Sequence, residues 1–232
     1  MNAGAAAAPA VRQRGDAAAP PPPAALLFVH ADTRLPPDAV TLVRDALSAR
    51  RVVGGGFVSL IETRGRTWWG QSLHNVAKTF YLPLLLRPRS YFAGLRVLFG
   101  DQCIFVRTDA FRAVGGFDEA VPIMEDADLC LKLHAAGPPG QLPGSPPATP
   151  STLPGRFLRP PPLFSRPRGR LVQLNRSVNT DGRRFLVWGN ERAVLTHFAV
   201  GIAWYAGCTK SQMIEVYDWL YGDIRARINS LQ

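Results

Sequence analysis

Residues 138–170 limit where this chain can fold. The stretch holds 11 of the 21 prolines of the 232-residue sequence and no acidic residue. Proline lacks a backbone N–H and clashes with the preceding helical turn, so a segment this rich in proline forms neither helix nor sheet ladder. We expect 138–169 to be a disordered or polyproline-like insert. A folded core must then come from 24–137 and 170–232, preceded by a low-complexity Ala/Pro segment, 1–23.

The two parts outside the insert alternate between strand-like and helix-like patterns. Short β-prone runs predict strands at 25–30, 54–62, 102–107 and 170–178. Apolar residues at helical spacing predict helices at 37–50, 67–86, 124–137 and 191–206. Pro83 should kink or end the second of these helices, and Thr209 with Gln212 forms a capping box that begins a last one. Strands that alternate with helices favour an α/β fold.

The net charge of +10 is compatible with a nucleic-acid partner. Residues 138–170 alone supply five arginines, and the basic residues are 24 Arg to 3 Lys beside abundant Ala, Gly and Pro. This pattern is typical of a codon-composition bias. The sequence has no zinc-finger spacing, basic zipper or aromatic-basic repeat. We therefore predict no nucleic-acid partner and keep a basic nucleic-acid-binding protein as the least favoured alternative.

Three cysteines, Cys103, Cys130 and Cys208, are far apart and odd in number. They predict neither a disulfide framework nor a metal site, and they fit a reducing compartment. The sequence has no run of 18 apolar residues that predicts a membrane-spanning helix. Residues 193–208 are interpreted as a buried helix, with peripheral membrane contact as the alternative. We expect an intracellular protein, cytoplasmic or organellar, without a signal peptide.

A candidate site lies where the first predicted strand ends. Residues 26–29 are apolar at consecutive positions, as in a strand buried on both faces, and His30, Ala31 and Asp32 follow. In open α/β sheets, ligands bind at the carboxyl ends of strands. A second candidate is an acidic cluster at the start of a predicted helix, where capping and a solvated face are the alternative explanation. Its members are Asp118, Glu119, Glu125, Asp126 and Asp128.

Four motifs follow one another along the chain: "FVHADTRLPP" (28–37), "GDQCIFVRTDAFRAVGGFDEAVPIMEDADLCLKL" (100–133), "VNTDGRRF" (178–185) and "FAVGIAWYAG" (198–207). Their order resembles the family 2 glycosyltransferases. The motifs are most similar to a small bacterial and plant or algal subgroup with "LHADTRLP" in place of the usual Asp-x-Asp. The resemblance covers about 24–137 and 170–222. It implies a glycosyltransferase A-type, Rossmann-like fold that binds nucleotide-diphosphate sugars on a central, mostly parallel sheet.

The start of the chain also resembles an internal part of that family. "MNAGAAAA" is similar to a "QMNAGA" segment that follows the family's first strand–helix–strand unit, an explanation that replaces a transit peptide. By this resemblance the chain would lack the opening strand, whose loop holds the nucleotide base. The insert likewise interrupts a point where family members run on directly. Both departures fit a faulty gene model as well as a real protein, so a non-catalytic remnant of the fold is the alternative function.

The resemblance implies an inverting, hexosyltransferase-like enzyme that moves a sugar from a nucleotide-diphosphate donor to an acceptor hydroxyl. Asp126 would be the general base that takes the proton of the acceptor hydroxyl. Glu125 would position the loop or the acceptor, and Asp101 and Gln102 would border the donor sugar or the acceptor. A nucleotidyltransferase is the neighbouring enzyme class, but it needs a Gly-rich basic loop near the N-terminus that the sequence does not show.

The resemblance also implies a divalent cation beside the diphosphate. Asp32, a hard oxygen ligand, suits Mg²⁺ or Mn²⁺. His30 stands at the first acid of the common pattern; it would ligate the ion, bond the ribose or only pack. Arg183 and Arg184 would close over the pyrophosphate as charged donors, or be solvated loop residues.

Overall fold

The computed structural model describes residues 25–121, 123–138, 168–183 and 189–220, except Gly207, Lys210 and Tyr217. The predictions for 1–23 and for nearly all of 138–169 therefore lie outside the described residues. The strands are β1 (Ala25–Leu27), β2 (Thr33–Arg34), β3 (Val52–Thr63), β4 (Arg66–Thr67), β5 (Phe105–Arg107) and β6 (Arg170–Asp181). The helices are α2 (Ala39–Ser48), α3 (Trp69–Leu86), α4 (Pro88–Phe92), the 3-10 helix η1 (Gly100–Gln102), α5 (Thr108–Ala113), α6 (Glu125–Ala136) and α8 (Asn190–Tyr205).

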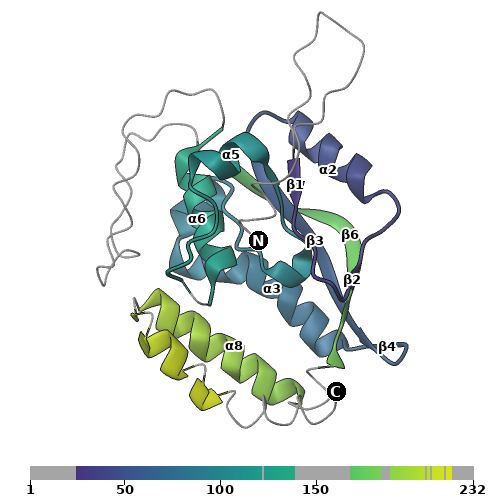
Figure 1. The fold of residues 1–232 in the computed structure, drawn as a ribbon, viewed down its shortest axis with the longest axis vertical. Helices are drawn as coiled ribbons and strands as arrows, with labels where there is room; N and C mark the ends of the chain where they lie inside the picture. Colours follow the sequence, from purple (N-terminus) through teal and green to yellow (C-terminus); the bar gives the residue numbers. More distant parts are fainter. Residues whose placement is uncertain are drawn as a thin grey trace, which may run out of the picture.

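The fold is mixed α/β around one sheet with the strand order β1-β5-β3-β6-β2, and β4 pairs with β3 (Figure 1). The two longest strands, β3 and β6, are parallel, whereas β5 and β1 on one side and β2 on the other are antiparallel to their neighbours. The predicted α/β class is confirmed, but the sheet is mixed, with β3 and β6 as its parallel pair, and not mostly parallel. A run of apolar residues indicates that a strand is buried, but it carries no information about the direction in which the strand runs.

Glycine near the start of β3 lets both neighbouring strands approach closely. A Cβ at Gly55 would overlap the carbonyl oxygen of Val172 on β6 and the ring of Phe105 on β5. The absence of a side chain here is a steric requirement, because two strands and an aromatic ring occupy the space. The sheet therefore brings β5 against the first half of β3.

Helices cover the two faces of the sheet with separate apolar clusters. On one face α2 packs through Val43 and Leu47 against Phe57 and Phe105. On the other face lie α5 and α6, with Leu129 and Leu133 of α6 among the fully buried residues. Figure 1 shows α2 on one side of the sheet and α5 and α6 on the other. Successive residues of β5 serve opposite clusters, as the alternation of side chains along a strand requires.

Helix α3 is buried through its polar face. The residues that it buries are mainly polar: Gln71, Ser72, Asn75, Lys78, Thr79 and Pro83. Its large exposed residues are apolar: Trp69, Leu73, Leu84 and Leu85. This is the reverse of an ordinary surface helix. Pro83 does not end the helix, which runs on to Leu86 before Arg87 N–H bonds back to the Pro83 carbonyl at 2.9 Å.

The C-terminal helical region follows its sequence signals. The helix predicted at 191–206 is α8, and the predicted capping box is confirmed by reciprocal hydrogen bonds: Thr209 N–H to Gln212 Oε1 at 2.9 Å, and Gln212 N–H to Thr209 Oγ1 at 3.4 Å. Among the described residues, no helix combines the length and the apolar character that crossing a membrane requires.

Candidate functional site

Three segments that lie far apart in the sequence meet at Gly100. The Gly100 N–H donates to Asp126 Oδ2 at 2.7 Å, which joins η1 to the first turn of α6. The position that a Cβ would take at Gly100 lies 2.5 Å from His30 Nε2 and 3.2 Å from Asp126 Oδ2. His30, in the loop after β1, and Asp126 therefore lie on the same side of this glycine. The structure brings together residues of the two predicted candidate sites.

Gln102 holds η1 in place. Its Oε1 accepts the Phe99 N–H at 3.0 Å, and its Nε2 donates to Thr79 Oγ1 at 2.9 Å and to the Asn75 carbonyl at 3.3 Å. The side chain is fully buried. Gln102 was predicted to border a substrate, but the structure gives it a supporting position between η1 and the polar face of α3.

Asp101 links the site to α3 and to the sheet. Its Oδ2 accepts a hydrogen bond from Asn75 Nδ2, and its main-chain carbonyl accepts one from Thr180 Oγ1 at 3.3 Å. Thr180 on β6 also bonds Thr33 Oγ1 on β2 at 3.0 Å. Asp101 is thereby held between the helix and the carboxyl-terminal end of β6.

Lys78 is a charged residue of this region that the sequence did not point to. It is buried on α3, and its Nζ lies 3.8 Å from the centroid of the Phe99 ring. Burial lowers the pKa of Lys78, while the charges of Asp101 and Asp126 act in the opposite direction. The charges of both acids, Asp101 next to Gly100 in the chain and Asp126 bonded to its N–H, therefore act on this lysine. The sequence feature that could have indicated Lys78 is a set of polar residues at helical spacing in α3: Gln71, Asn75 and Lys78.

Asp126 has the chemistry of a proton acceptor near neutral pH. Burial, followed by the charge of Glu125, raises the pKa of Asp126 to about 7, against the opposing effects of the Gly100 N–H and Lys78. Its Oδ2 is held by Gly100, whereas its Oδ1 is shielded from solvent and has no hydrogen-bond partner among the described residues. A carboxyl group with a pKa near the working pH can both take up and release a proton.

The turn before Asp126 has an unusual backbone. Met124 has φ 71°, in the left-handed region that a residue with a side chain seldom adopts. It is followed directly by Glu125 and Asp126 in the first turn of α6, where the helix dipole favours acids. Asp128, in the same first turn, is paired with Lys132 at 2.8 Å, while Asp126 is directed to Gly100. The start of α6 has no side-chain capping hydrogen bond among the described residues.

Asp32 and Arg183 lie at the carboxyl-terminal end of β6. The Asp32 carbonyl accepts the Asp181 N–H at 3.2 Å, and Asp181 Oδ2 pairs with Arg183 Nε at 2.8 Å. Asp32 is exposed, as is the Arg183 side chain at 73%. Arg184, the other predicted pyrophosphate contact, lies outside the described residues.

The described residues could hold a divalent cation in one way, through a single carboxylate together with substrate phosphates. Among the described residues, no three potential ligands of the His, Cys, Asp and Glu types gather in one place. Asp32 is a single exposed carboxylate next to the loop that carries His30. Mg²⁺ and similar ions are commonly held by one or two carboxylates together with substrate phosphates, and Asp32 fits that manner of binding.

Comparisons with known proteins give this chain no relative. No protein-family model matches it, and neither a curated protein nor a solved structure is similar enough to count as a match. The function is therefore argued from the motifs of the chain and from the geometry around Gly100.

Proposed function

We propose that this chain carries the core of an inverting, metal-dependent glycosyltransferase with a glycosyltransferase A-type fold. It would move a sugar from a nucleotide-diphosphate donor to an acceptor hydroxyl. The observation that supports this best is Asp126: a carboxyl group with a pKa of about 7, fixed through one oxygen, lies beside His30 at the junction of three segments.

The proton transfer follows from how the two oxygens of Asp126 are used. Oδ2 accepts the Gly100 N–H, which fixes the orientation of the carboxylate. Oδ1 has no donor among the described residues; it would accept the proton of the acceptor hydroxyl as that oxygen attacks the anomeric carbon, once the acceptor displaces the atoms that shield Oδ1 from solvent. The bond from the anomeric carbon to the diphosphate breaks on the opposite side, so an α-linked donor gives a β-linked product.

The donor side of the site is the loop that carries His30 and Asp32, together with Arg183. Asp32 would hold Mg²⁺ or Mn²⁺, which when bound neutralises the charge that develops on the leaving diphosphate. Arg183 is already oriented by Asp181 near that end of β6 and supplies a further positive charge for an anionic leaving group. His30 lies between this side and Asp126, where it can donate a hydrogen bond to the donor.

The full chain should be tested against a panel of sugar nucleotides with Mn²⁺, by measuring the nucleoside diphosphate that is released. Asp126→Asn should reduce the rate about 10²–10⁴-fold, as the loss of a general base does. Asp45→Asn, the same chemical change on the exposed surface of α2, should leave the rate unchanged. If no sugar nucleotide is turned over, the chain is the non-catalytic remnant; full activity in Asp126→Asn would show that another group is the base.

A further inference from the structure

The outward face of α3 is apolar from one end of the helix to the other. Trp69, Leu73 and Leu84 are spaced by four and eleven residues, which places them on one face. Trp69 and Leu73 are each 63% exposed, and Leu85, next to Leu84, is 73% exposed. Large apolar residues that are exposed singly are common, whereas a continuous row of them marks an interaction surface.

Helix α4 continues this surface through a chain of contacts. The guanidinium of Arg96 lies 5.3 Å from the ring centroid of Phe80, which is seven residues after Leu73 on α3, and 4.3 Å from that of Tyr91 on α4. The Tyr91 ring in turn packs on Phe92, with the centroids 5.3 Å apart, and Phe92 is 79% exposed. We call the exposed residues of the two helices the apolar face of α3 and α4: Trp69, Leu73, Leu84, Leu85 and Phe92.

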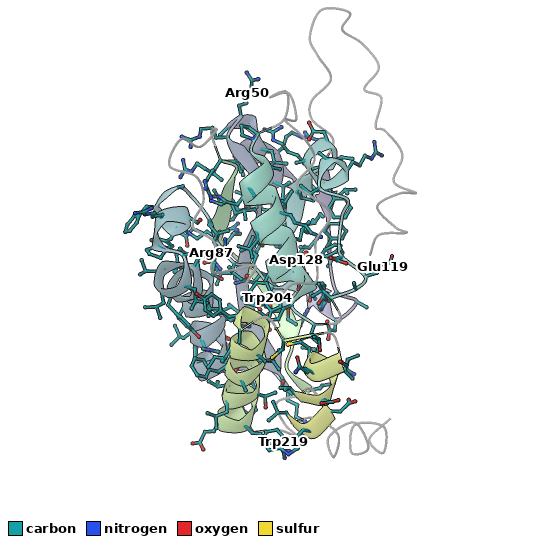
Figure 2. All side chains as sticks on the ribbon, turned by 90° about the vertical axis from the view of Figure 1, so that its left-hand side faces the viewer. Arg50, Arg87, Glu119, Asp128, Trp204 and Trp219 are labelled. Atoms are coloured by element: carbon teal, nitrogen blue, oxygen red, sulfur yellow. The ribbon has the colours of Figure 1, made fainter. Side chains whose placement is uncertain are left out.

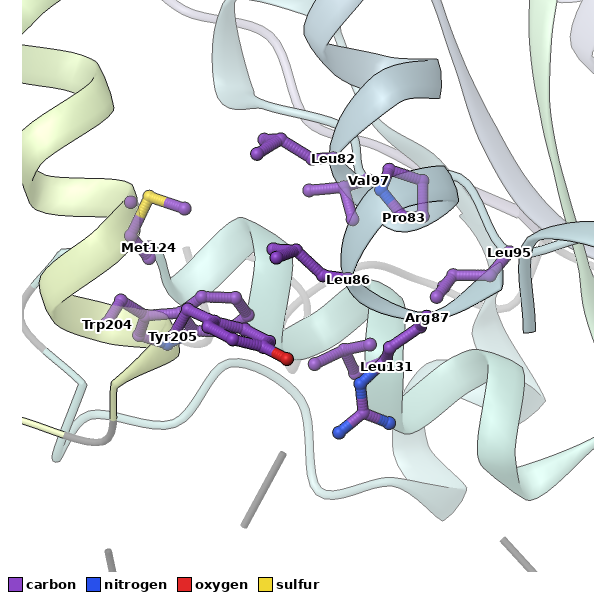
Figure 3. Close-up of a pocket in the computed structure, with 11 residues that line it drawn as sticks. Leu82, Pro83, Leu86, Arg87, Leu95, Val97, Met124, Leu131, Trp204 and Tyr205 are labelled. Carbon is purple, nitrogen blue, oxygen red and sulfur yellow. The ribbon is translucent and has the colours of Figure 1, made fainter. Parts of the chain in front are cut away.

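The other side of α3 is already covered by the protein. In its first half, Asn75 bonds to Asp101 of the candidate site. In its last turns, Leu82 and Leu86 line the same space as the aromatic rings of α8, as Figure 3 shows. The apolar face is therefore the side of α3 that remains open to solvent.

The charges along this part of the chain are all positive. Residues 63–100 contain six basic residues and no acidic one. Arg64 and Arg66 precede the first turn of α3, Arg89 follows its last turn, and all three are exposed. Figure 2 shows Arg87, where α3 meets α4, and Glu119 towards opposite sides of the molecule. Basic residues therefore stand at both ends of the apolar face.

We propose that the apolar face of α3 and α4 docks on an anionic phospholipid surface. Amphipathic helices that lie on membranes present Trp, Phe and Leu to the lipid and carry Lys and Arg beside them. The apolar side chains would enter the boundary between headgroups and acyl chains, and the exposed arginines would remain among the lipid phosphates, which attract them. The inference goes beyond the proposed function and does not depend on it.

Charge favours a lipid surface over a second copy of the chain. A two-fold interface places the same patch of both copies against itself. Here it would bring Arg64, Arg66 and Arg89 of one copy towards the same arginines of the other, and like charges repel. An anionic surface opposes no charge of this face and is complementary to all of them.

Cosedimentation of the full chain with lipid vesicles tests the proposal. The chain should bind vesicles of phosphatidylcholine and phosphatidylserine, and bind vesicles of phosphatidylcholine alone at least about tenfold more weakly. Leu73→Gln and Leu85→Gln should each weaken binding about tenfold, because each removes a leucine that would leave water. Arg64→Gln should weaken it about fivefold. Val40→Gln is the matched control, because Val40 is 64% exposed on α2, and it should leave binding unchanged.

The substituted residues are exposed, so circular dichroism spectra of the variants should match that of wild type. Vesicle binding that depends on phosphatidylserine but is equal in wild type and Leu73→Gln would overturn the proposal, because charge alone would then hold the chain on the lipid. Equal weakening by Val40→Gln and Leu73→Gln would also overturn it. A dimer in analytical ultracentrifugation that Leu73→Gln dissociates, without vesicle binding, would assign the face to a second copy instead.

Discussion

Replacing Asp126 by asparagine should remove activity and increase stability, and the gain should depend on pH. Asparagine keeps an oxygen that accepts the Gly100 N–H, so the junction between η1 and α6 is retained. It removes a negative charge that burial, Glu125 and Asp101 all disfavour. The same change therefore separates what Asp126 does in the reaction from what its charge costs the fold.

Whether stability rises or falls with pH follows from the direction of the pKa shift. The pKa of Asp126 rises from 3.8 to about 7 in the folded chain, so the folded state holds the proton more tightly than the unfolded state. Below about pH 4 both states are protonated and the residue has no effect on stability. As the pH rises to about 7, the unfolded state ionises first and stability is lost. Above that pH the full cost is about 4 kcal/mol.

Urea unfolding of wild type and Asp126→Asn at about pH 8 and about pH 4 measures this cost. The variant should be more stable by up to about 4 kcal/mol at the higher pH and by almost nothing at the lower. The exposed control Asp45→Asn should change stability by less than about 0.5 kcal/mol at both. Burial lowers the pKa of His134 to about 4. His134 therefore destabilises wild type and variant alike in acid, and its effect cancels in the stability difference between them. An equal gain at both pH values would refute the argument that Asp126 is desolvated.

Three further substitutions test the neighbours of Asp126. Gly100→Ala should place a Cβ against His30 Nε2 and reduce transfer up to about 10²-fold with an unchanged circular dichroism spectrum, and full activity would contradict the arrangement. Lys78→Met removes a cation that lowers the pKa of Asp126, so the acidic limb of the pH–rate profile should move to higher pH. A limb that does not move would show that the charge of Lys78 does not act on the group that titrates. Asp32→Ala should abolish the Mn²⁺-dependent part of uridine diphosphate binding, and unchanged calorimetry would argue against a metal role.

The elements of the fold were predictable where the signal is local. The capping box at Thr209 and Gln212 is specified within four residues, and α6 is specified by its acidic first turn and by Gly137, which has φ 83°. The direction of β5 was not predictable. Its three residues are buried in both a parallel and an antiparallel arrangement, so their composition is the same in either case.

The sequence also did not predict which face of α3 is buried, and the reason is physical. Periodicity predicts a helix at 67–86, but an apolar face is normally assigned to the interior. Here the interior face is polar, because Asn75 and Thr79 bond to Asp101 and Gln102 of a segment more than twenty residues away. The helical spacing of Gln71, Asn75 and Lys78 marks a polar face, but it does not show that this face is the buried one. Lys78 was missed because its partners lie in that distant segment.

The resemblance assigned the base to Asp126, but the residue types alone do not distinguish Asp126 from Asp101. Asp101 follows Gly100 in the chain, Asp126 accepts the Gly100 N–H, and the charges of both acids act on Lys78. Asp101 Oδ2 is occupied by the amide of Asn75, a donor fixed on α3. Asp126 Oδ1 has no donor in the described part of the chain, while its Oδ2 is fixed by backbone. An oriented carboxylate with one unoccupied oxygen is what proton abstraction requires, so the hydrogen bonds favour Asp126 over Asp101 as the proposed base.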